Sequence, residues 1–253
     1  MVLGNMDKFN GEGLVAFLDI LGFSKEIEEK WGNEVDNPLT KILTLKENLP
    51  IFPIAKLGDE SLKAKATRNY IPRVQTISDS IVVSFGFDPK PVMGDLVLGA
   101  LASFNTIAII WRKALEAGFT VRGAVDFGPI YWNVNEVIGP AFIVAYKLEQ
   151  TVAKTSRVIL SSAANRKLAA INQQAKTLWN DMMLGLLMKD IDGYIAINPH
   201  RLYEGEADKK HVVDLLIGMR DVATGSSREK YGPILACLTG SATGQNGEEL
   251  GKY

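Results

Sequence analysis

Cysteine is nearly absent from this chain of 253 residues, which holds Cys237 alone. An intrachain disulfide and a zinc site built from several thiolates are therefore excluded, and this cysteine usage fits a reducing compartment. Histidine is almost as scarce, because His200 and His211 are the only two. This small number leaves little room for a metal cluster held by histidine.

The chain also lacks an excess of charge of either sign: 28 Lys and Arg face 29 Asp and Glu, and the formal net charge is −1. A global electrostatic attraction to nucleic acid or to an anionic membrane is therefore not expected. The amino terminus has no basic stretch followed by an apolar one, so it does not resemble a signal peptide. We expect a cytoplasmic protein with neither nucleic acid nor membrane among its partners.

Long hydrophobic runs are missing as well. The apolar run 96–111 is interrupted by Ser103, Asn105 and Thr106, and it is shorter than the about 20 residues that a membrane span needs. We expect a buried helix there. With 47% apolar and 23% charged residues, no repeat and no dividing linker, the sequence predicts one globular domain over 1–253. Its core is expected at about 12–160, followed by a carboxy-terminal extension at about 161–253.

Short β-rich runs and longer helical runs alternate along the core. The predicted strands are, in order, 14–21, 74–77, 80–85, 119–127 with a return starting at 130–131 after Gly128-Pro129, and 158–160. The predicted helices are 24–46 with a break near Pro38, 92–117, 139–152 and one from Ser161. Ser24 is expected to cap the first helix, and Phe142, Ala145, Leu148 and Val152 are expected to face the core.

The first six of these elements have the order β-α-β-β-α-β over 14–127, which predicts an α+β fold of the ferredoxin-like, split βαβ type. The two-residue connection Ser78-Asp79 predicts a tight hairpin. Residues 50–72 are expected to form an irregular surface insertion. In the extension, one strand at 194–197 and one closing amphipathic helix at 228–238 are predicted.

Asp19 is the sharpest anomaly, because it lies inside an apolar strand where an ionised carboxylate is costly unless it is paired or holds a metal. In a split βαβ fold, this strand lies beside the hairpin that carries Asp79. Two carboxylates without histidine favour Mg²⁺ or Mn²⁺ with substrate phosphates. The turn Gly22-Phe23-Ser24 adds free backbone N–H groups for an anion, so the pattern indicates phosphoryl transfer. The alternatives are that Asp79 is only a turn residue and that Asp19 pairs with a lysine.

Four blocks of the sequence resemble the class III nucleotidyl cyclases. They are FLDILGFS at 17–24, QTISDS at 75–80, FTVRGAVDFGP at 119–129, and the helix 139–149. The resemblance covers about 14–150, and it implies that Asp19, Asp79 and the backbone of Ile20 bind two metal ions. It implies further that the backbone from Ile20 through Leu21, Gly22 and Phe23 to Ser24 holds the phosphates, with Arg122 on the triphosphate. Arg122 in an ordinary strand ion pair is the alternative.

The departures from that family concern the base and the transition state. Where purine cyclases usually have Lys or Glu to read the base, this chain has Gln75, and the companion position falls at Glu136. The asparagine that positions the ribose falls at Ile143. The arginine that steadies the transition state falls at Lys147, which keeps the charge but loses the bidentate fork.

The amino-acid sequences of these blocks are similar to those of the stand-alone pyrimidine cyclases of the bacterial anti-phage Pycsar systems. That resemblance implies a phosphorus–oxygen lyase that makes cyclic UMP or cyclic CMP from UTP or CTP, with UTP favoured, for a separate effector. It also implies a homodimer with sites at the interface, for which Phe142, Val144 and Tyr146 are candidates unless they only pack the core. Tyr70, Arg73, Lys56, Lys63 and Lys65 either reach the nucleotide or belong to a solvated loop.

Other interpretations stay open. One is a cyclase for ATP or GTP, and another is a catalytically silent module that binds a nucleotide or a partner protein. A palm-type polymerase or a diguanylate cyclase is a more distant alternative, because the chain has no GGDEF-like hairpin.

Overall fold

The computed structural model describes residues 8–47, 49, 51, 70–174 and 185–240. Its strands are β1 (Lys8–Leu21), β2 (Tyr70–Ile77), β3 (Ser80–Phe87), β4 (Thr120–Asn133), β5 (Val137–Ile138), β6 (Val158–Leu160), β7 (Leu187–Lys189) and β8 (Ile195–Ile197). Its helices are α1 (Phe23–Lys30), α2 (Pro38–Glu47), α4 (Met93–Glu116), α5 (Pro140–Thr151), α6 (Ser162–Gln174), the 3₁₀ helix η2 (Pro199–Leu202), α8 (Gly205–Val222), α9 (Ser226–Glu229) and α10 (Gly232–Thr239).

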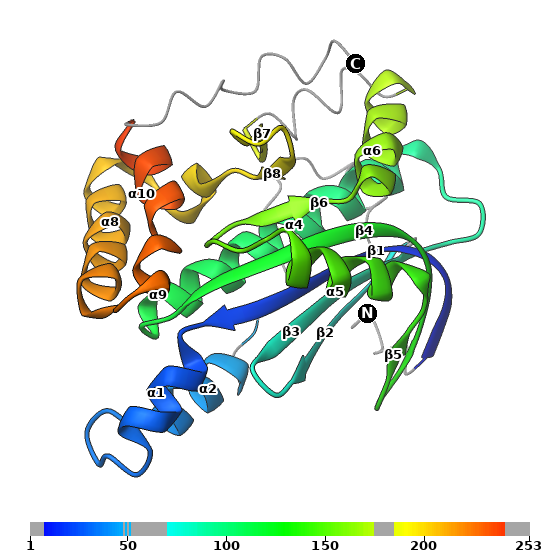
Figure 1. Ribbon diagram of the computed structural model, residues 1–253. Helices are drawn as coiled ribbons and strands as arrows, with labels where there is room; N and C mark the ends of the chain where they lie inside the picture. The colour runs from blue at the N-terminus through cyan, green and yellow to red at the C-terminus, as the bar shows by residue number, and fades with distance from the viewer. Residues whose placement is uncertain (1–7, 48, 50, 52–69, 175–184, 241–253) are drawn as a thin grey trace.

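The strands form one mixed sheet in the order β2-β3-β1-β4-β6-β8-β7, with β5 paired to β4 (Figure 1). The first four strands pair antiparallel, and β1 lies between β3 and β4. This is the strand order of a split βαβ unit, so the predicted α+β class and ferredoxin-like core are confirmed. The parallel pairing of β6 with β4 then continues the sheet into the extension.

Strand β1 is buried on both faces, which explains why its sequence is an almost continuous apolar run. Side chains alternate along a strand, so Leu14, Ala16, Leu18 and Ile20 join the main core on one face. Val15 and Phe17 join a smaller cluster on the other face. Asp19 follows them with the same period of two, and it therefore belongs to the face of the smaller cluster.

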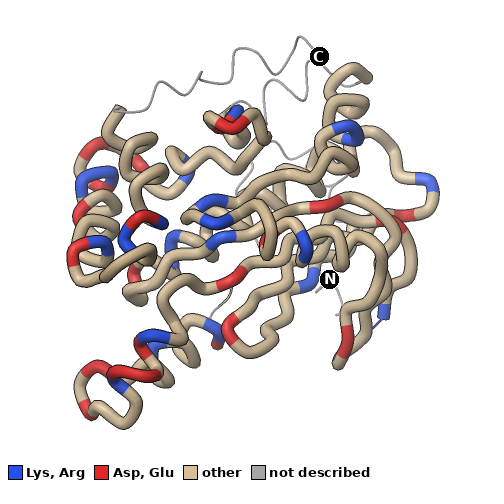
Figure 2. The backbone as a smooth tube through the Cα atoms, in the orientation of Figure 1, with Lys and Arg blue, Asp and Glu red and all other residues tan. Residues whose placement is uncertain are grey.

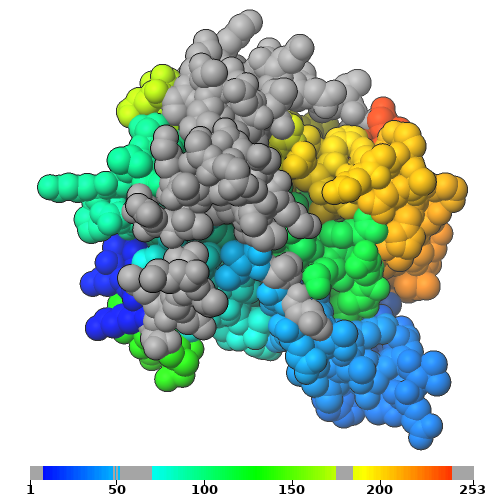
Figure 3. Space-filling view, turned by 180° about the vertical axis from the view of Figure 1, so that it is seen from behind, coloured from blue at the N-terminus to red at the C-terminus, as the bar shows by residue number. Residues whose placement is uncertain are grey.

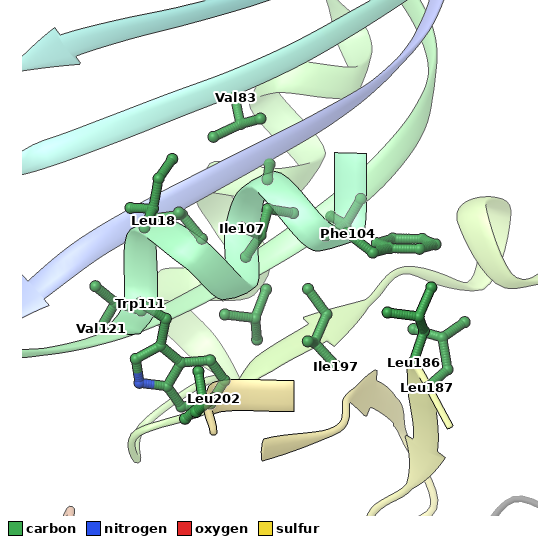
Figure 4. Packing of buried hydrophobic residues seen from close by; sticks show 14 of the residues in the cluster. Leu18, Val83, Phe104, Ile107, Trp111, Val121, Leu186, Leu187, Ile197 and Leu202 are labelled. Atoms are coloured by element: carbon green, nitrogen blue, oxygen red, sulfur yellow. The ribbon is translucent and has the colours of Figure 1, made fainter. Parts of the chain in front are cut away.

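Helix α4 lies behind the sheet in Figure 1 and supplies much of the main core. Figure 4 shows this helix between Leu18 and Val83 of the sheet and the residues of the extension, with Trp111 beside Leu202 and Phe104 on the side of Leu186. Among the described residues, α4 is also long and apolar enough to cross a membrane by composition, but 83% of its apolar window is buried. The prediction of a buried helix at 96–111 is thus confirmed.

Helix α5 covers the other face of the sheet, over β4 and β1 (Figure 1). Its buried residues are Ala141, Ala145 and Glu149, four residues apart, which is the spacing of one helix face. Phe142, Leu148 and Val152, expected to face the core, are only partly buried beside this stripe. Small alanines allow the helix to approach the sheet closely, so the buried carboxylate of Glu149 lies directly over the strands.

Charged residues gather on α1, α2 and α8, and few lie along the strands (Figure 2). Seen from behind, α1 and α2 form a projection from the rest of the surface (Figure 3). Trp31 and Val35 are exposed on this projection, whereas Ile42 and Leu45 of α2 pack into the main core.

Four local expectations were wrong. Ser24 does not cap α1: the cap position is Gly22, and no side chain bonds to the helix start there. Gly128-Pro129 does not interrupt β4, because both residues stay paired with β1, and at this point β4 has a partner strand on one side only, where a proline is tolerated. The single helix expected at 228–238 is two helices, α9 and α10, separated at Lys230 and Tyr231.

The fourth concerns residues 70–72, which begin strand β2 rather than ending an irregular insertion. The rest of that insertion, with Lys56, Lys63 and Lys65, lies outside the described residues. Helix α8 and strand β7 were not predicted at all. Other expectations are confirmed, including the tight hairpin at Ser78-Asp79, the start of α2 at Pro38 and a helix from about Ser161, since α6 begins at Ser162. The Oγ of Ser161 accepts a hydrogen bond from the Ala164 N–H at 2.9 Å at the start of this helix.

Candidate active site

Asp19 and Arg122 lie directly opposite each other on the paired strands β1 and β4. Both side chains are 17% exposed. Arg122 donates two hydrogen bonds to the same oxygen, Oδ2 of Asp19, from Nε at 3.0 Å and from Nη2 at 2.9 Å. The partner that the buried strand requires for Asp19 is therefore an arginine, not a lysine, and Arg122 belongs to a mostly buried ion pair.

A second carboxylate reaches the same guanidinium from α5. Oε1 of Glu149 lies 2.7 Å from Nε of Arg122, and the Glu149 side chain is fully buried. Oε2 of Glu149 accepts a hydrogen bond from Nε2 of Gln150 at 2.7 Å. One arginine thus lies between two carboxylates, one from a strand and one from a helix.

Burial raises the pKa of both carboxyls above their ordinary values. For Asp19, the hydrogen bonds and charge of Arg122 oppose the effect of burial, and the charge of Asp79 adds to it. For Glu149, the charge of Arg122 opposes the effect of burial, and the charge of Asp19 adds to it. The carboxyls therefore influence each other, and a further positive charge beside them would favour their ionised forms.

Asp79 lies in the turn between β2 and β3, next to strand β1. Its carbonyl oxygen accepts a hydrogen bond from the Ile20 N–H at 3.2 Å, and the turn residue Ser78 has a positive φ of 52°. Lys46 of α2 donates to the Ser78 carbonyl, and burial lowers the pKa of Lys46 while the charge of Asp79 opposes this. The structure thus brings Asp79 to the end of β1 where Asp19 lies, as the split βαβ pattern predicts.

The turn from β1 into α1 is made by Gly22, whose φ of 90° is a left-handed conformation that favours glycine. Helix α1 starts at Phe23, so the N–H groups of its first turn are free of helical partners. Ser24 is exposed, and Phe23 packs against Phe119 with ring centroids 5.9 Å apart. These residues follow Asp19, Ile20 and Leu21 without a gap, and they place a helix start beside the carboxylates.

Gln75 and Glu136 belong to a different part of the same sheet face. Nε2 of Gln75 donates to the carbonyl oxygen of Asn133 at 3.4 Å. Oε1 of Gln75 is buried and accepts no hydrogen bond among the described residues. Glu136 is exposed in the β4–β5 turn, where its N–H donates to Oδ1 of Asn133 at 2.9 Å. Gln75 and Glu136 therefore lie near each other at the β4–β5 turn, because both are hydrogen-bonded to Asn133.

Lys147 is not brought to Asp19 within one chain. It is exposed on α5, two positions before Glu149, and so it lies on the far side of the helix from the sheet. Ile143, one turn earlier, is 48% exposed on that same side. Val144 and Tyr146 are 38% and 44% exposed, although the Tyr146 ring also contacts Phe17 at 5.2 Å.

The donor set near Asp19 fits a hard divalent cation. The Asp19 and Asp79 carboxylates and the Ile20 carbonyl are oxygen ligands of the kind that Mg²⁺ and Mn²⁺ prefer, and these ions commonly complete their shell with water and phosphate oxygens. In the described part of the chain, no group of three or more His, Cys, Asp or Glu side chains is arranged to hold a metal ion. These three oxygen groups by themselves would make only part of a coordination shell, and Asp19 shares its charge with Arg122.

Three charged residues near these carboxylates were not predicted as site residues. Glu149 carried a signal, because it falls on the stripe of Ala141 and Ala145 and a carboxylate on a buried helix face needs a partner. No sequence pattern pointed to Lys46 or Lys230. The tertiary fold brings the charge of Lys46 near Asp79, and it brings Lys230 near Asp19, where the lysine charge lowers the pKa of the carboxyl.

No protein-family model matches the sequence, and no curated protein matches it. Among solved structures, the chain is similar to a class III adenylyl cyclase-like ATP-binding protein from Pseudomonas aeruginosa, with 12% identity and a TM-score of 0.43 over 77% of this chain and 40% of that one. It is also similar to a bacterial light-regulated adenylyl cyclase, with 12% identity and a TM-score of 0.41 over 88% of this chain and 58% of that one. The chain thus spans less than two thirds of either structure, and neither likeness identifies a substrate or a site residue.

Proposed function

We propose that this protein is a divalent-metal-dependent nucleotide cyclase that converts UTP or CTP to the 3′,5′-cyclic monophosphate and pyrophosphate. The observation that carries the proposal is the meeting of two carboxylates at one end of β1. Asp19 lies in an otherwise apolar strand, and Asp79 is held beside it by the hydrogen bond from the Ile20 N–H. A carboxylate in a buried strand destabilises the fold unless its charge is compensated, and a bound cation would provide that compensation.

In this proposal, Asp19, Asp79 and the Ile20 carbonyl hold one or two Mg²⁺ or Mn²⁺ ions. Such ions activate the attacking ribose 3′-oxygen and offset the charge that develops on the phosphate oxygens. The N–H groups at the start of α1, from Phe23 onward, bind the phosphates, because a helix amino terminus favours an anion. Arg122 contacts the triphosphate from the adjacent strand with N–H donors that its carboxylate partners leave unused.

Gln75 is the residue that we assign to the base. Its buried Oε1 has a free acceptor site among the described residues, and an amide can pair with the edge of uracil or of cytosine. The two similar solved structures are a class III adenylyl cyclase-like ATP-binding protein and a light-regulated adenylyl cyclase, so a purine nucleotide is the alternative substrate. A neutral amide in place of a charged base-reading residue favours the pyrimidines.

We further propose a homodimer in which α5 faces the partner subunit. Ile143, Val144 and Tyr146 leave an apolar surface exposed on α5, and Lys147 projects from it away from Asp19 of its own chain. A symmetric dimer would bring Lys147 to the partner's site. The cyclic nucleotide would then serve as a second messenger to a separate effector in anti-phage defence, made by one cyclase-like domain over 1–253.

A second candidate is a catalytically silent module that binds a nucleotide or a partner protein. One observation favours it: both Arg122 hydrogen bonds already go to Asp19, which leaves that carboxylate partly neutralised. The absence of Asn and Arg at Ile143 and Lys147 points the same way.

One assay separates these functions. The purified protein is incubated with Mn²⁺ and with ATP, GTP, CTP or UTP separately, and the products are identified by mass spectrometry. We expect a cyclic monophosphate from UTP or CTP and none from the purines. A purine product would keep the metal site and overturn the assignment of Gln75. Saturable nucleotide binding without any pyrophosphate would establish the silent module instead.

A further inference from the structure

Arg122 contacts two carboxylates, but both of its hydrogen bonds to them go to Asp19. Its Nε carries a single hydrogen, and this hydrogen is directed at Oδ2 of Asp19. Oε1 of Glu149 lies closer to the same nitrogen, at 2.7 Å, yet it accepts no hydrogen bond among the described residues. A fully buried carboxylate oxygen is therefore left without a hydrogen bond beside a donor that is engaged elsewhere.

Such an oxygen is costly, because the charge of Arg122 offsets only part of its lost solvation and no hydrogen bond supplies the rest. The charges in direct contact are also unbalanced: Asp19 and Glu149 carry two negative charges when ionised, and Arg122 supplies one positive charge. Lys230 acts on Asp19 and Lys154 on Glu149 only at longer range. A divalent cation at Asp19 would remove both defects, because Asp19 would no longer need the guanidinium and Glu149 would receive it. The required movement is small, because the two carboxylates already contact the same Nε.

We propose that Arg122 has two positions, on Asp19 in the metal-free protein and on Glu149 when a divalent cation takes Asp19. Glu149 is then a positioning residue that accepts the displaced guanidinium, while Arg122 acts as the internal cation that holds Asp19 until a metal ion arrives. This inference rests on the proposed function, in that a cation binds at Asp19. It goes beyond that function by making Arg122 a competitor of the metal ion and Glu149 the residue that relieves the competition.

The two variants Glu149→Gln and Arg122→Gln are expected to change Mn²⁺ affinity in opposite directions. Without the Glu149 charge, Arg122 has no alternative partner, so Mn²⁺ binding weakens by about tenfold, within the usual range of coupling between two sites. Without Arg122, Asp19 loses the only cation among the described residues that is hydrogen-bonded to it, so Mn²⁺ binds more tightly. The effect of Glu149→Gln should also be several-fold smaller in the Arg122→Gln background, because Glu149 acts through Arg122.

Mn²⁺ affinity is measured by electron paramagnetic resonance of the free ion, with folding checked by circular dichroism. Glu116→Gln is the matched control, since Glu116 is a carboxylate on α4 that pairs with Arg112 at the surface. A second readout needs no variant of Glu149: the Nε–H resonance of Arg122, assigned by its loss in Arg122→Lys, is followed while diamagnetic Mg²⁺ is added. We expect this resonance to shift as the acceptor changes from Asp19 to Glu149.

Two results would separate the failures. If Asp19→Asn leaves Mn²⁺ binding unchanged, no cation binds at Asp19, and the proposed function falls together with this inference. If binding depends on Asp19 while Glu149→Gln stays within twofold of the wild type, or the Arg122 resonance does not move at saturating Mg²⁺, the two-position arrangement alone is overturned.

Discussion

One face of the central sheet is covered by α4 and α6, and α8 and α10 join the same core beyond the sheet. The other face, among the described elements, is covered by α5 and the β4–β5 turn. The first face holds the main core, where Leu18 of β1 is fully buried among apolar side chains. The second face, one residue further along the same strand, holds Asp19 with Arg122 and Glu149. A single strand thus stabilises the fold with one set of side chains and presents charge with the other.

This difference indicates where substitutions should affect activity and where they should affect stability. The face under α4 has no buried ion pair on β1, so its residues contribute through packing alone. The face under α5 carries three charged groups whose burial raises the pKa of both carboxyls. The two faces can therefore be tested separately with variants of neighbouring positions.

The largest effect is expected for Asp79→Asn. Losing one of two metal carboxylates should lower turnover by about a thousandfold, since such charge stabilisation is worth several kcal/mol. Stability should change by less than about 0.5 kcal/mol, because Asp79 lies in a partly exposed turn. Product formation and urea denaturation measure the two quantities.

The matched control is Asp88→Asn, at the exposed far end of the same strand β3. It should leave turnover unchanged. If turnover falls equally in both variants, Asp79 has no specific role in the reaction.

The next effect is expected on the opposite face. Leu18→Ala removes a side chain with no exposed surface, and buried Leu→Ala changes cost about 2–5 kcal/mol of unfolding free energy. Leu39→Ala, at an exposed site on α2, should cost much less. Both are measured by urea denaturation, and a loss below about 1 kcal/mol for Leu18→Ala would contradict the assignment of this face to the core.

Gln75→Leu should have a smaller effect, on substrate selection. Removing one hydrogen bond to the base corresponds to about a tenfold loss in kcat/KM for the pyrimidine nucleotide. Thr76→Val is the control, because the next residue of a strand points to the opposite face. If kcat/KM is unchanged in Gln75→Leu, the side chain serves only to tie β2 to Asn133.

The smallest effect is a pH dependence at Asp126 of β4. Burial raises its pKa above the ordinary 3.8, although the hydrogen bond from Ser161 opposes this. For a carboxyl with a raised pKa in the folded state, the stabilisation is complete below the unfolded pKa and is lost as pH rises through the folded pKa. Wild type should therefore lose unfolding free energy as pH rises above 3.8 through the raised pKa of Asp126, and Asp126→Asn should lose less of it. Glu34→Gln, at an exposed site, should follow the wild type in the same urea titrations.

The core was predictable because its signals are local. The apolar run of β1, the two-residue hairpin at Ser78-Asp79 and the apolar run that becomes α4 each have a pattern that is visible within a few residues. The extension was less predictable: α8 is half exposed and carries many charges, so its apolar stripe is narrow. At Gly128-Pro129, local propensity indicated a break, and pairing with β1 overrode it.

The sequence by itself determined that a carboxylate lies in a buried strand, that a second one ends the neighbouring hairpin, and that a glycine turn starts a helix beside them. These are consequences of residue order, because strand alternation and turn geometry act over a few positions. Only the tertiary structure decided what Asp19 faces. Arg122 is 103 residues away in the chain, and it meets Asp19 because β1 and β4 pair in one register. Glu149 joins them because α5 packs its alanine face on those strands, and no local pattern fixes which strand a helix will cover.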